Sequence, residues 1–280
     1  MHIQPYDNQN RPIVGVDSDI TPLTYFNIVK LKQGEAFEYR IPGYESCIVP
    51  ATGTVDVEVA GEKYDAIGKR SANVWDGEPE GVYVPTDTPA VFTCVSGSAE
   101  VFIAGASFDQ TLEPFAVRTD EIDKVQYGSD DTKTHRKIKH ILGNRHHDKV
   151  GRLLVSELYT VGQGGWSGFP SHKHDTDRLP EETRHNEIYN FRFKPDHGFG
   201  MQLLQPEGEA VGEAFHLVDG STFAFAEGYH PCVVAPGYEM YYFTILGGQS
   251  QRSLVQSFQP EHAYQVETIP GIKDMIAKFK

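Results

Sequence analysis

Short runs of apolar residues, many alternating with polar ones and separated by Gly, Pro and Asp, fill most of this chain. Such alternation is typical of half-buried strands, because successive side chains of a strand point to opposite faces. The clearest runs of the first half are 26–31, 47–50, 54–60, 82–85, 90–95 and 99–104. Helical periodicity is scarce, with one helix predicted at 272–279 and a weaker one at 120–125. The pattern therefore predicts an all-β fold.

The second half combines strand patterns with turn signals. Residues 164–171 predict a turn that enters a strand, and residues 187–193 alternate so that Glu187 and Tyr189 share one face. Residues 219–228 predict a turn, a strand and a second turn, which delivers His230 at the start of a further strand. Many short strands joined by turns are typical of a β-sandwich or barrel.

A faint internal repeat suggests two related halves. Residues 80–89, followed by an apolar strand, resemble residues 221–231, and the overlay puts Thr88 or Pro89 at the position of His230. A chain of 280 residues is long enough for two ordinary domains.

The polar, turn-rich segment 127–135 is the predicted boundary between the halves. We therefore predict two tandem barrels, at 1–130 and 131–280.

The most informative chemistry of the sequence is a set of three histidines and one glutamate. His172 and His174 point the same way in a strand, with Cα atoms roughly 6.5–7 Å apart, so both can reach one divalent ion. Glu187 faces inward on a following strand, and His230 follows a turn. Three imidazoles and a carboxylate without a thiolate suit Zn, Fe or Mn. A hydrogen-bonded polar cluster is the alternative, but it would leave these groups competing for partners in a confined space.

Charge and composition narrow the partners. The net charge of −14 and pI near 5.3 argue against nucleic-acid or anionic-membrane partners, which require clustered cations. No apolar run approaches the ~18 residues of a membrane span, and the first residues do not resemble a signal peptide. Cys47, Cys94 and Cys232 are far apart and odd in number, which suits a reducing compartment. The sequence predicts a cytoplasmic protein that binds a small molecule.

Several motifs carry a resemblance to known families. The His-x-His pair, Glu187 and the segment 220–230 resemble the motifs of the cupin superfamily. A longer series of segments resembles the 5-deoxy-glucuronate isomerase family of inositol catabolism, in which the long spacer before Glu187 and the Gly-Tyr-His-Pro form of 228–231 are expected. The segments are 136–142, 153–157, 165–176, 180–182, 187–193, 198–199, 228–231 and 235–238.

The resemblance implies a fold, a metal site and a reaction. The fold is two tandem cupin barrels, of which only the C-terminal one binds metal, since His2 is the one histidine of the first 130 residues. The metal ligands would be His172, His174, Glu187 and His230, holding one divalent ion, Zn or Mn, with Fe as a further option. The reaction would be an aldose–ketose isomerisation of 5-deoxy-glucuronate to 5-dehydro-2-deoxy-gluconate in myo-inositol degradation. Cupins commonly associate through barrel edges, so we expect a homo-oligomer.

Catalytic and substrate-binding groups are less well defined by the sequence. Glu182 matches the Pro-Glu-Glu of the family and could act as the base, and Tyr189 could act as an acid or hydrogen-bond donor. Arg184 could bind the substrate carboxylate, and Gln202 could hydrogen-bond sugar hydroxyls.

Three other functions are compatible with the same motifs. The sister 5-keto-4-deoxyuronate isomerases share the two-barrel plan and the metal set. A cupin dioxygenase would use the same ligands to activate oxygen. A non-catalytic sugar-binding cupin is disfavoured because all four ligand residues are present.

Overall fold

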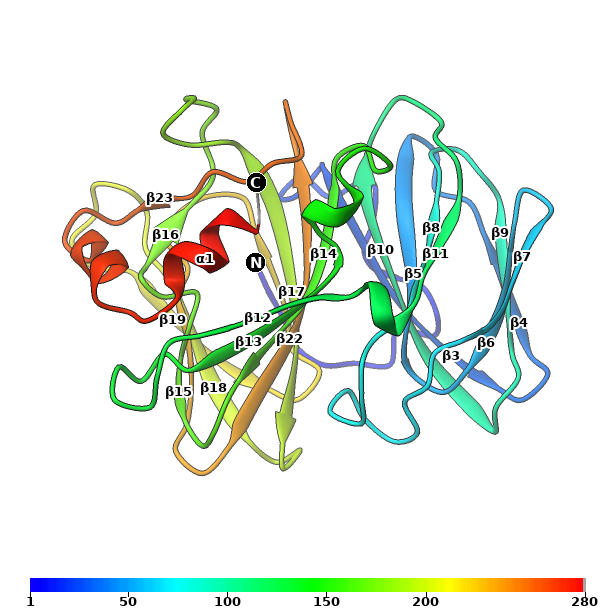
Figure 1. Cartoon of the computed structure of the whole chain (residues 1–280), viewed down its shortest axis with the longest axis horizontal. Coiled ribbons are helices and arrows are strands. Elements are labelled where there is room, and N and C mark those ends of the chain that lie inside the picture. Colours follow the sequence, from blue (N-terminus) through cyan, green and yellow to red (C-terminus); the bar gives the residue numbers. More distant parts are fainter. Residues whose placement is uncertain (279–280) are drawn as a thin grey trace.

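Two β-sandwiches, one from each half of the chain, lie side by side in the computed structural model (Figure 1). The structure describes residues 1–278. The strands of the first sandwich lie on the right of Figure 1, and those of the second lie on the left together with the single α-helix. The expectation of an all-β fold is confirmed.

The first sandwich consists of a large and a small antiparallel sheet. The first large sheet has, in spatial order, β11 (Phe115–Val117), β8 (Gly81–Val84), β5 (Tyr44–Thr52), β10 (Ser98–Ser107), β3 (Thr24–Lys32) and β2 (Pro12–Val14). The first small sheet has β4 (Ala36–Tyr39), β9 (Ala90–Cys94), β6 (Val55–Val59) and β7 (Glu62–Ile67).

The second sandwich repeats this plan and adds a two-stranded sheet. The second large sheet has β1 (His2–Ile3), β20 (Thr222–Phe225), β17 (His185–Lys194), β22 (Glu239–Gly248), β14 (Leu153–Thr160), β13 (Arg136–Leu142) and β12 (Asp123–Tyr127). The second small sheet has β15 (Gly165–Ser167), β21 (Cys232–Val234), β18 (Phe199–Leu204) and β19 (Glu213–Val218). The two-stranded sheet pairs β16 (His172–Lys173) with β23 (Ser257–Phe258).

The strand orders show that the faint sequence repeat is structural. The order β8-β5-β10-β3-β2 corresponds to β20-β17-β22-β14-β13, and β4-β9-β6-β7 corresponds to β15-β21-β18-β19. Two short strands of the first 130 residues, β1 and β12, nevertheless belong to the second large sheet. The boundary between residues 130 and 131 stays a prediction.

Three layers of apolar side chains separate the four main sheets. Alternating strand residues of the first sandwich fill the space between its two sheets, as Ile48 and Phe92 do. The two large sheets pack face to face through a layer that contains Phe102 and Phe243, whose ring centroids are 4.8 Å apart. A third layer fills the second sandwich and contains Phe191. The two halves therefore share the middle layer, and each has a further layer of its own.

The helical segments are short and differ partly from the expectation. The predicted C-terminal helix is confirmed as α1 (Ile272–Ala277), and the predicted end at residue 279 lies outside the described residues. The helix predicted at 120–125 is wrong: a 3₁₀ turn, η1 (Thr119–Glu121), is followed by β12, which pairs with β13. Tertiary pairing overrides the weak local preference there. The other 3₁₀ segments are η2 (Asn144–His146) and η3 (Ala263–Glu267). No helix of residues 1–278 is long and apolar enough to cross a membrane.

Candidate metal centre

The His-x-His segment enters the second sandwich on a very short strand. His172 lies in β16 opposite Phe258, and His174 follows directly after the strand. Backbone bonds hold both residues, since the His230 amide donates to the His172 carbonyl at 3.4 Å and the His185 amide donates to the His174 carbonyl at 2.9 Å. The main chain thus holds His172 beside His230 and His174 beside the start of β17.

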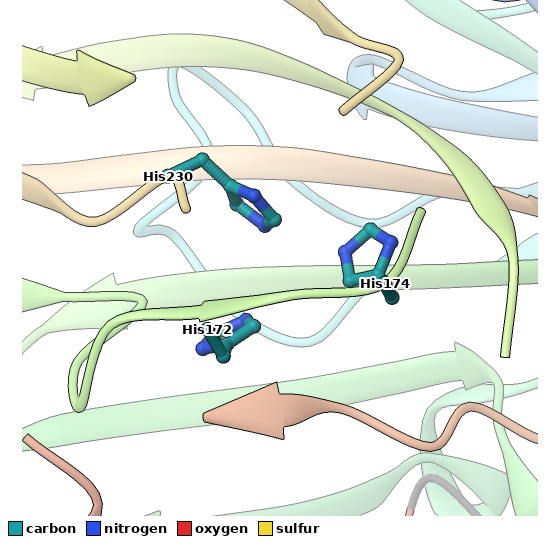
Figure 2. Close-up of side chains that lie close together, drawn as sticks. All are labelled: His172, His174 and His230. Atoms are coloured by element: carbon teal, nitrogen blue, oxygen red, sulfur yellow. The ribbon is translucent and has the colours of Figure 1, made fainter. Parts of the chain in front are cut away.

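Three imidazole rings converge from these segments (Figure 2). One ring nitrogen each of His172, His174 and His230 lies within 4.8 Å of the other two. All three side chains are buried. The predicted convergence of residues far apart in the sequence is therefore present.

Glu187 completes the set from the neighbouring strand β17. Its Oε2 lies 3.1 Å from Nε2 of His174 and 3.2 Å from Nε2 of His230. Ligand atoms that share one ion at about 2.1 Å lie roughly 3–3.5 Å from one another, so the carboxylate is at ligand distance from both histidines. Burial alone would raise the pKa of Glu187, but the neighbouring His174 and His230 imidazoles hold that pKa well below its usual value.

Backbone carbonyls orient all three rings. Nδ1 of His172 donates to the Pro170 carbonyl at 3.0 Å, Nδ1 of His174 to that of His185 at 3.2 Å, and Nδ1 of His230 to that of Gly228 at 2.8 Å. Because a carbonyl only accepts, each Nδ1 carries a proton, which leaves Nε2 of each ring as the atom that a metal ion would use. Such bonds from the outer ring nitrogen are the usual support of metal-binding histidines.

The donor set fits a divalent cation. Nε2 of His230 is buried and has no hydrogen bond of acceptable geometry within residues 1–278. A buried nitrogen without a hydrogen bond is costly unless a cation accepts its lone pair. A metal ion bound by the three Nε2 atoms and the Glu187 carboxylate would remove that cost.

The two histidines of the His-x-His pair titrate in opposite directions. Burial, followed by repulsion from His230 and His174, lowers the pKa of His172 to about 3. Burial acts in the same direction on His174, but its hydrogen bond with Glu187 raises its pKa above the usual 6.5. His172 can therefore bind a cation without losing a proton, whereas His174 must release one only at a pH below its raised pKa.

A glycine and an aspartate connect the two ligand segments. Gly228 has a φ of +90°, which other residues rarely adopt, and its carbonyl accepts the His230 ring proton. Its amide donates to Oδ2 of Asp175 at 2.8 Å. This contact fixes the turn before His230 against the residue that follows His174.

Lys173 points away from the centre, as strand parity predicts. Its Nζ is buried and lies 2.7 Å from Asp175 Oδ1 and 2.9 Å from Glu182 Oε2. Glu182 is fully buried and also accepts the backbone amides of Asp175 and Thr176 at 2.8 and 3.1 Å. Within residues 1–278 no hydrogen bond or ion pair joins Glu182 to the three histidines. The Glu182 carboxylate thus belongs to an ion cluster with Lys173 and Asp175 that orders the loop.

Tyr189 lies next to the histidines, as its shared face with Glu187 predicts. Its ring centroid is 6.4 Å from that of His230 and 4.4 Å from that of Tyr242. It lines one cavity together with His172 and Glu187. Burial, followed by the negative charge of Glu187, raises its pKa well above 10, so its hydroxyl keeps its proton.

The two residues predicted to bind substrate lie in different surroundings. Arg184 is exposed and directly precedes β17, and its backbone amide donates to Asp177. Gln202 is fully buried, and its Nε2 donates to the backbone carbonyls of His230 and Pro231 at 2.7 and 3.1 Å. Its contacts are those of a residue that positions the His230 segment.

Three neighbours of the centre were missed by the sequence analysis. Nε2 of Gln256 lies 3.0 Å from Nε2 of His172, and Arg136 and Tyr242 line the same cavity as His172. Residue 256 comes from the segment before β23, and the other two come from β13 and β22. Arg136 begins one of the segments that carry the family resemblance, but no local pattern places any of the three at the site, because long-range strand pairing brings them there.

Comparison with known proteins identifies the family. A family model described as KduI/IolB matches residues 2–265. The chain belongs to the KduI/IolB family.

Named relatives agree with this KduI/IolB assignment over almost the whole chain. A 5-deoxy-glucuronate isomerase of Listeria monocytogenes is 29% identical over 273 residues, which is 94% of this chain and 97% of the relative. A 5-deoxy-glucuronate isomerase of Bacillus licheniformis is 28% identical over 243 residues, covering 86% and 87% of the two chains. The KduI/IolB chain described here is an enzyme, an isomerase of the intramolecular oxidoreductase class.

Solved structures support the fold of this KduI/IolB chain. An IolB-like protein from Salmonella typhimurium LT2 superposes with a TM-score of 0.79 at 26% identity, covering 86% of this chain and 89% of the other. An oxalate decarboxylase variant from Bacillus subtilis superposes with a TM-score of 0.59 at 12% identity, covering 88% and 75%. The second likeness concerns the fold alone, and together they give the chain a cupin-like, nearly all-β architecture.

Proposed function

We propose that this chain is a divalent-metal-dependent aldose–ketose isomerase that converts 5-deoxy-glucuronate to 5-dehydro-2-deoxy-gluconate in the cytoplasm, during myo-inositol degradation. One observation carries the proposal: four ligand-type side chains converge in a chain of the KduI/IolB family. Named relatives that share most of this chain are 5-deoxy-glucuronate isomerases.

The reaction moves one hydrogen from C2 to C1 of the open-chain aldehyde, either as a proton through an enediolate or as a hydride shifted between the two carbons. The C2 proton is weakly acidic until the neighbouring carbonyl is polarised, and a divalent ion held by His172, His174, Glu187 and His230 would supply that polarisation when bound. Zn and Mn both suit this donor set, with Fe as a further option. The proton on the C2 hydroxyl moves to the C1 oxygen, so the substrate is neither oxidised nor reduced overall.

Tyr189 is the side chain best suited to donate a hydrogen bond to the reacting oxygens. Its raised pKa keeps the hydroxyl protonated, and it lines the cavity beside His172 and Glu187. A base role for Glu182 remains a prediction, and it would require that carboxylate to leave Lys173. The bonds of Gln202 to the backbone around His230 support a positioning role for it.

The C-terminal segment is suited to shield the reaction from water. Phe258 of β23 and Ile272 and Met275 of α1 line the cavity beside His172 and Tyr189. These apolar side chains would keep water away from the enediolate, and an outward movement of the segment would admit the sugar acid.

The sister activity is the nearest alternative function, and a dioxygenase is the next. The purified protein, reconstituted separately with Zn or Mn, should convert 5-deoxy-glucuronate under anaerobic conditions and should turn over 5-keto-4-deoxyuronate more slowly. Nuclear magnetic resonance of the product identifies the ketose. A strict requirement for oxygen would contradict the proposal, and so would a preference for the ketouronate.

A pair of variants tests the metal centre itself. His174→Ala should bind no stoichiometric metal by mass spectrometry and should lose turnover. His216→Ala, which changes an exposed histidine of β19, should retain both. Full turnover by metal-free wild-type protein would refute metal dependence. The predicted homo-oligomer can be checked by light scattering on the same sample.

A further inference from the structure

Three arginines are buried within residues 1–278, and two of them have an evident structural partner. Arg70 donates to both oxygens of Glu157 at 2.5 and 2.7 Å. Arg252 donates to the backbone carbonyls of Leu142, Gly143 and Leu153 at 2.8 to 2.9 Å. These guanidinium groups join segments of the fold.

Arg136 is the third, and its surroundings are different. It is 3% exposed, and its terminal nitrogens donate to the hydroxyls of Tyr127 and Tyr242 at 2.5 and 2.7 Å. Its Nε is buried without a hydrogen-bond partner in residues 1–278, and none of the carboxylates described pairs with it. A buried charge without a counter-charge is costly, so a fold keeps one only where something else neutralises it.

The guanidinium lines a cavity that reaches two of the four candidate metal ligands. Arg136, Tyr127 and Tyr242 line this cavity together with His172 and Glu187. The Tyr242 hydroxyl also lies 2.7 Å from the Ser167 hydroxyl. This contact fixes the tyrosine side chain that accepts a hydrogen bond from Arg136. The cavity therefore has a cation at one part of its wall and ligand-type side chains at another.

We propose that Arg136 binds the carboxylate of an open-chain sugar acid while the aldehyde end of the same molecule lies at the histidine cluster. This inference rests on the proposed function, since it assigns the carboxylate subsite of that active site. Two of the five N–H groups of the guanidinium donate to tyrosines, which leaves Nε–H and further N–H groups for a carboxylate. A planar, pre-oriented fork is the geometry that carboxylates bind most strongly.

The charges of the cavity agree with an anionic ligand. Glu187 contributes one negative charge and Arg136 one positive charge, so a divalent ion would leave two positive charges in excess. A sugar acid brings one negative charge, and the enediolate that forms during isomerisation brings a second. The cavity would then be neutral at the transition state, where neutralisation accelerates the reaction most.

A binding experiment on the metal-loaded protein tests the subsite without turnover. The ligands are the open-chain alditol acid made by reducing the aldehyde of 5-deoxy-glucuronate, and the neutral alditol that carries CH₂OH in place of the carboxylate. Calorimetry on the wild type should give a preference of about 100-fold for the acid, because a charge-assisted bidentate bond is lost in the neutral compound. Equal affinity for the two would overturn the inference.

Two variants assign the preference to one residue. Arg136→Met should bind the acid about 100-fold more weakly and the neutral alditol as the wild type does, which also shows that the cavity is intact. Arg136→Lys keeps the charge but not the fork, and it should recover only part of the preference. An acid preference that survives in both variants, or that disappears in Arg184→Gln instead, would overturn the inference.

Activity separates this inference from the proposed function. If the wild type prefers the acid through Arg136 but does not isomerise 5-deoxy-glucuronate, the proposed function fails and the subsite stands. If it isomerises this substrate and Arg136→Met does so with unchanged KM and kcat, the function stands and the subsite fails. Loss of turnover with both acidic and neutral aldehydes in Arg136→Met, together with loss of neutral-alditol binding, would indicate a merely structural residue.

Discussion

In the first sandwich, apolar side chains such as Ile48, Val55 and Phe92 fill the space between the two sheets, whereas in the second the equivalent space also holds histidines, Glu187 and Arg136. The strand orders of the two sandwiches correspond. The same scaffold therefore tolerates either an apolar interior or a reactive one.

Strand register shows where the two interiors diverge. Glu187 pairs with Phe225, the last residue of β20, and Ser46 pairs with Val84, the last residue of the corresponding strand β8. Ser46 therefore occupies the position of Glu187, and its hydroxyl lies 3.0 Å from that of Tyr39. The first sandwich supports the second, because the two large sheets pack against each other through a shared apolar layer.

The largest expected difference lies between Arg70, which pairs with a buried carboxylate, and Arg136, which we propose to bind substrate. Arg70→Met should lower the free energy of unfolding by about 3–5 kcal/mol, because Glu157 would remain buried and unpaired. Arg136→Met should change it by less than about 1 kcal/mol, since no carboxylate loses its partner. Urea denaturation of both variants checks the comparison, and equal losses would contradict it.

Transferring the first-sandwich residue into the second should abolish the metal centre. Glu187→Ser should weaken metal binding more than the about 10–100-fold that is typical for loss of an outer partner, because a direct ligand disappears. Competition titration with a chromogenic chelator measures this change. Ser46→Ala is the matched control in the first sandwich and should leave metal affinity unchanged. A Glu187→Ser protein with wild-type affinity would refute the ligand assignment.

Acidification should weaken metal binding through His174 before it affects His172. The pKa of His174 is raised above 6.5, so below that raised value the metal-free protein carries a proton on His174 that the ion must displace. The apparent affinity should therefore be highest above the raised pKa and fall about tenfold for each pH unit below it. The pKa of His172 is lowered to about 3, so this residue should add nothing between pH 8 and 5. Competition titrations at several pH values give the slope, and an affinity that stays flat to pH 5 would contradict the expectation.

The smallest expected effect concerns the positioning of His230. Gln202→Met preserves the size of the side chain but removes its bonds to the His230 and Pro231 carbonyls. Metal affinity should fall by about tenfold or less, as expected for lost neutral hydrogen bonds. A raised KM with unchanged metal affinity would instead support the sequence-based prediction that Gln202 contacts substrate.

Local patterns in the sequence were sufficient for most strands and for the histidine cluster. Parity placed His172 and His174 on one side and Lys173 on the other, and alternation placed Tyr189 beside Glu187. These features depend on the period of a strand, which the sequence displays directly.

Features that depend on distant partners could not be predicted. The sequence shows Glu182 as a loop carboxylate near the ligands, but it does not show that Lys173 and two backbone amides surround it. In the sequence, Arg136 is one of 25 lysines and arginines. The pairing of β13 with β12 and β14 places it at the cavity. The burial of the Arg136 guanidinium without a carboxylate partner is known only from the folded structure.

The pairing of β1 with β20 has a consequence for any attempt to dissect this molecule. His2 and Ile3 lie along Thr222 and Phe223, on the strand that leads into the turn before His230. In a fragment that begins at residue 131, β20 would be an exposed edge strand, and its unpaired amides and carbonyls would be free to pair with another chain. The N-terminal residues thus complete the edge of the second large sheet, and the half that holds the histidines depends on residues from the opposite end of the sequence.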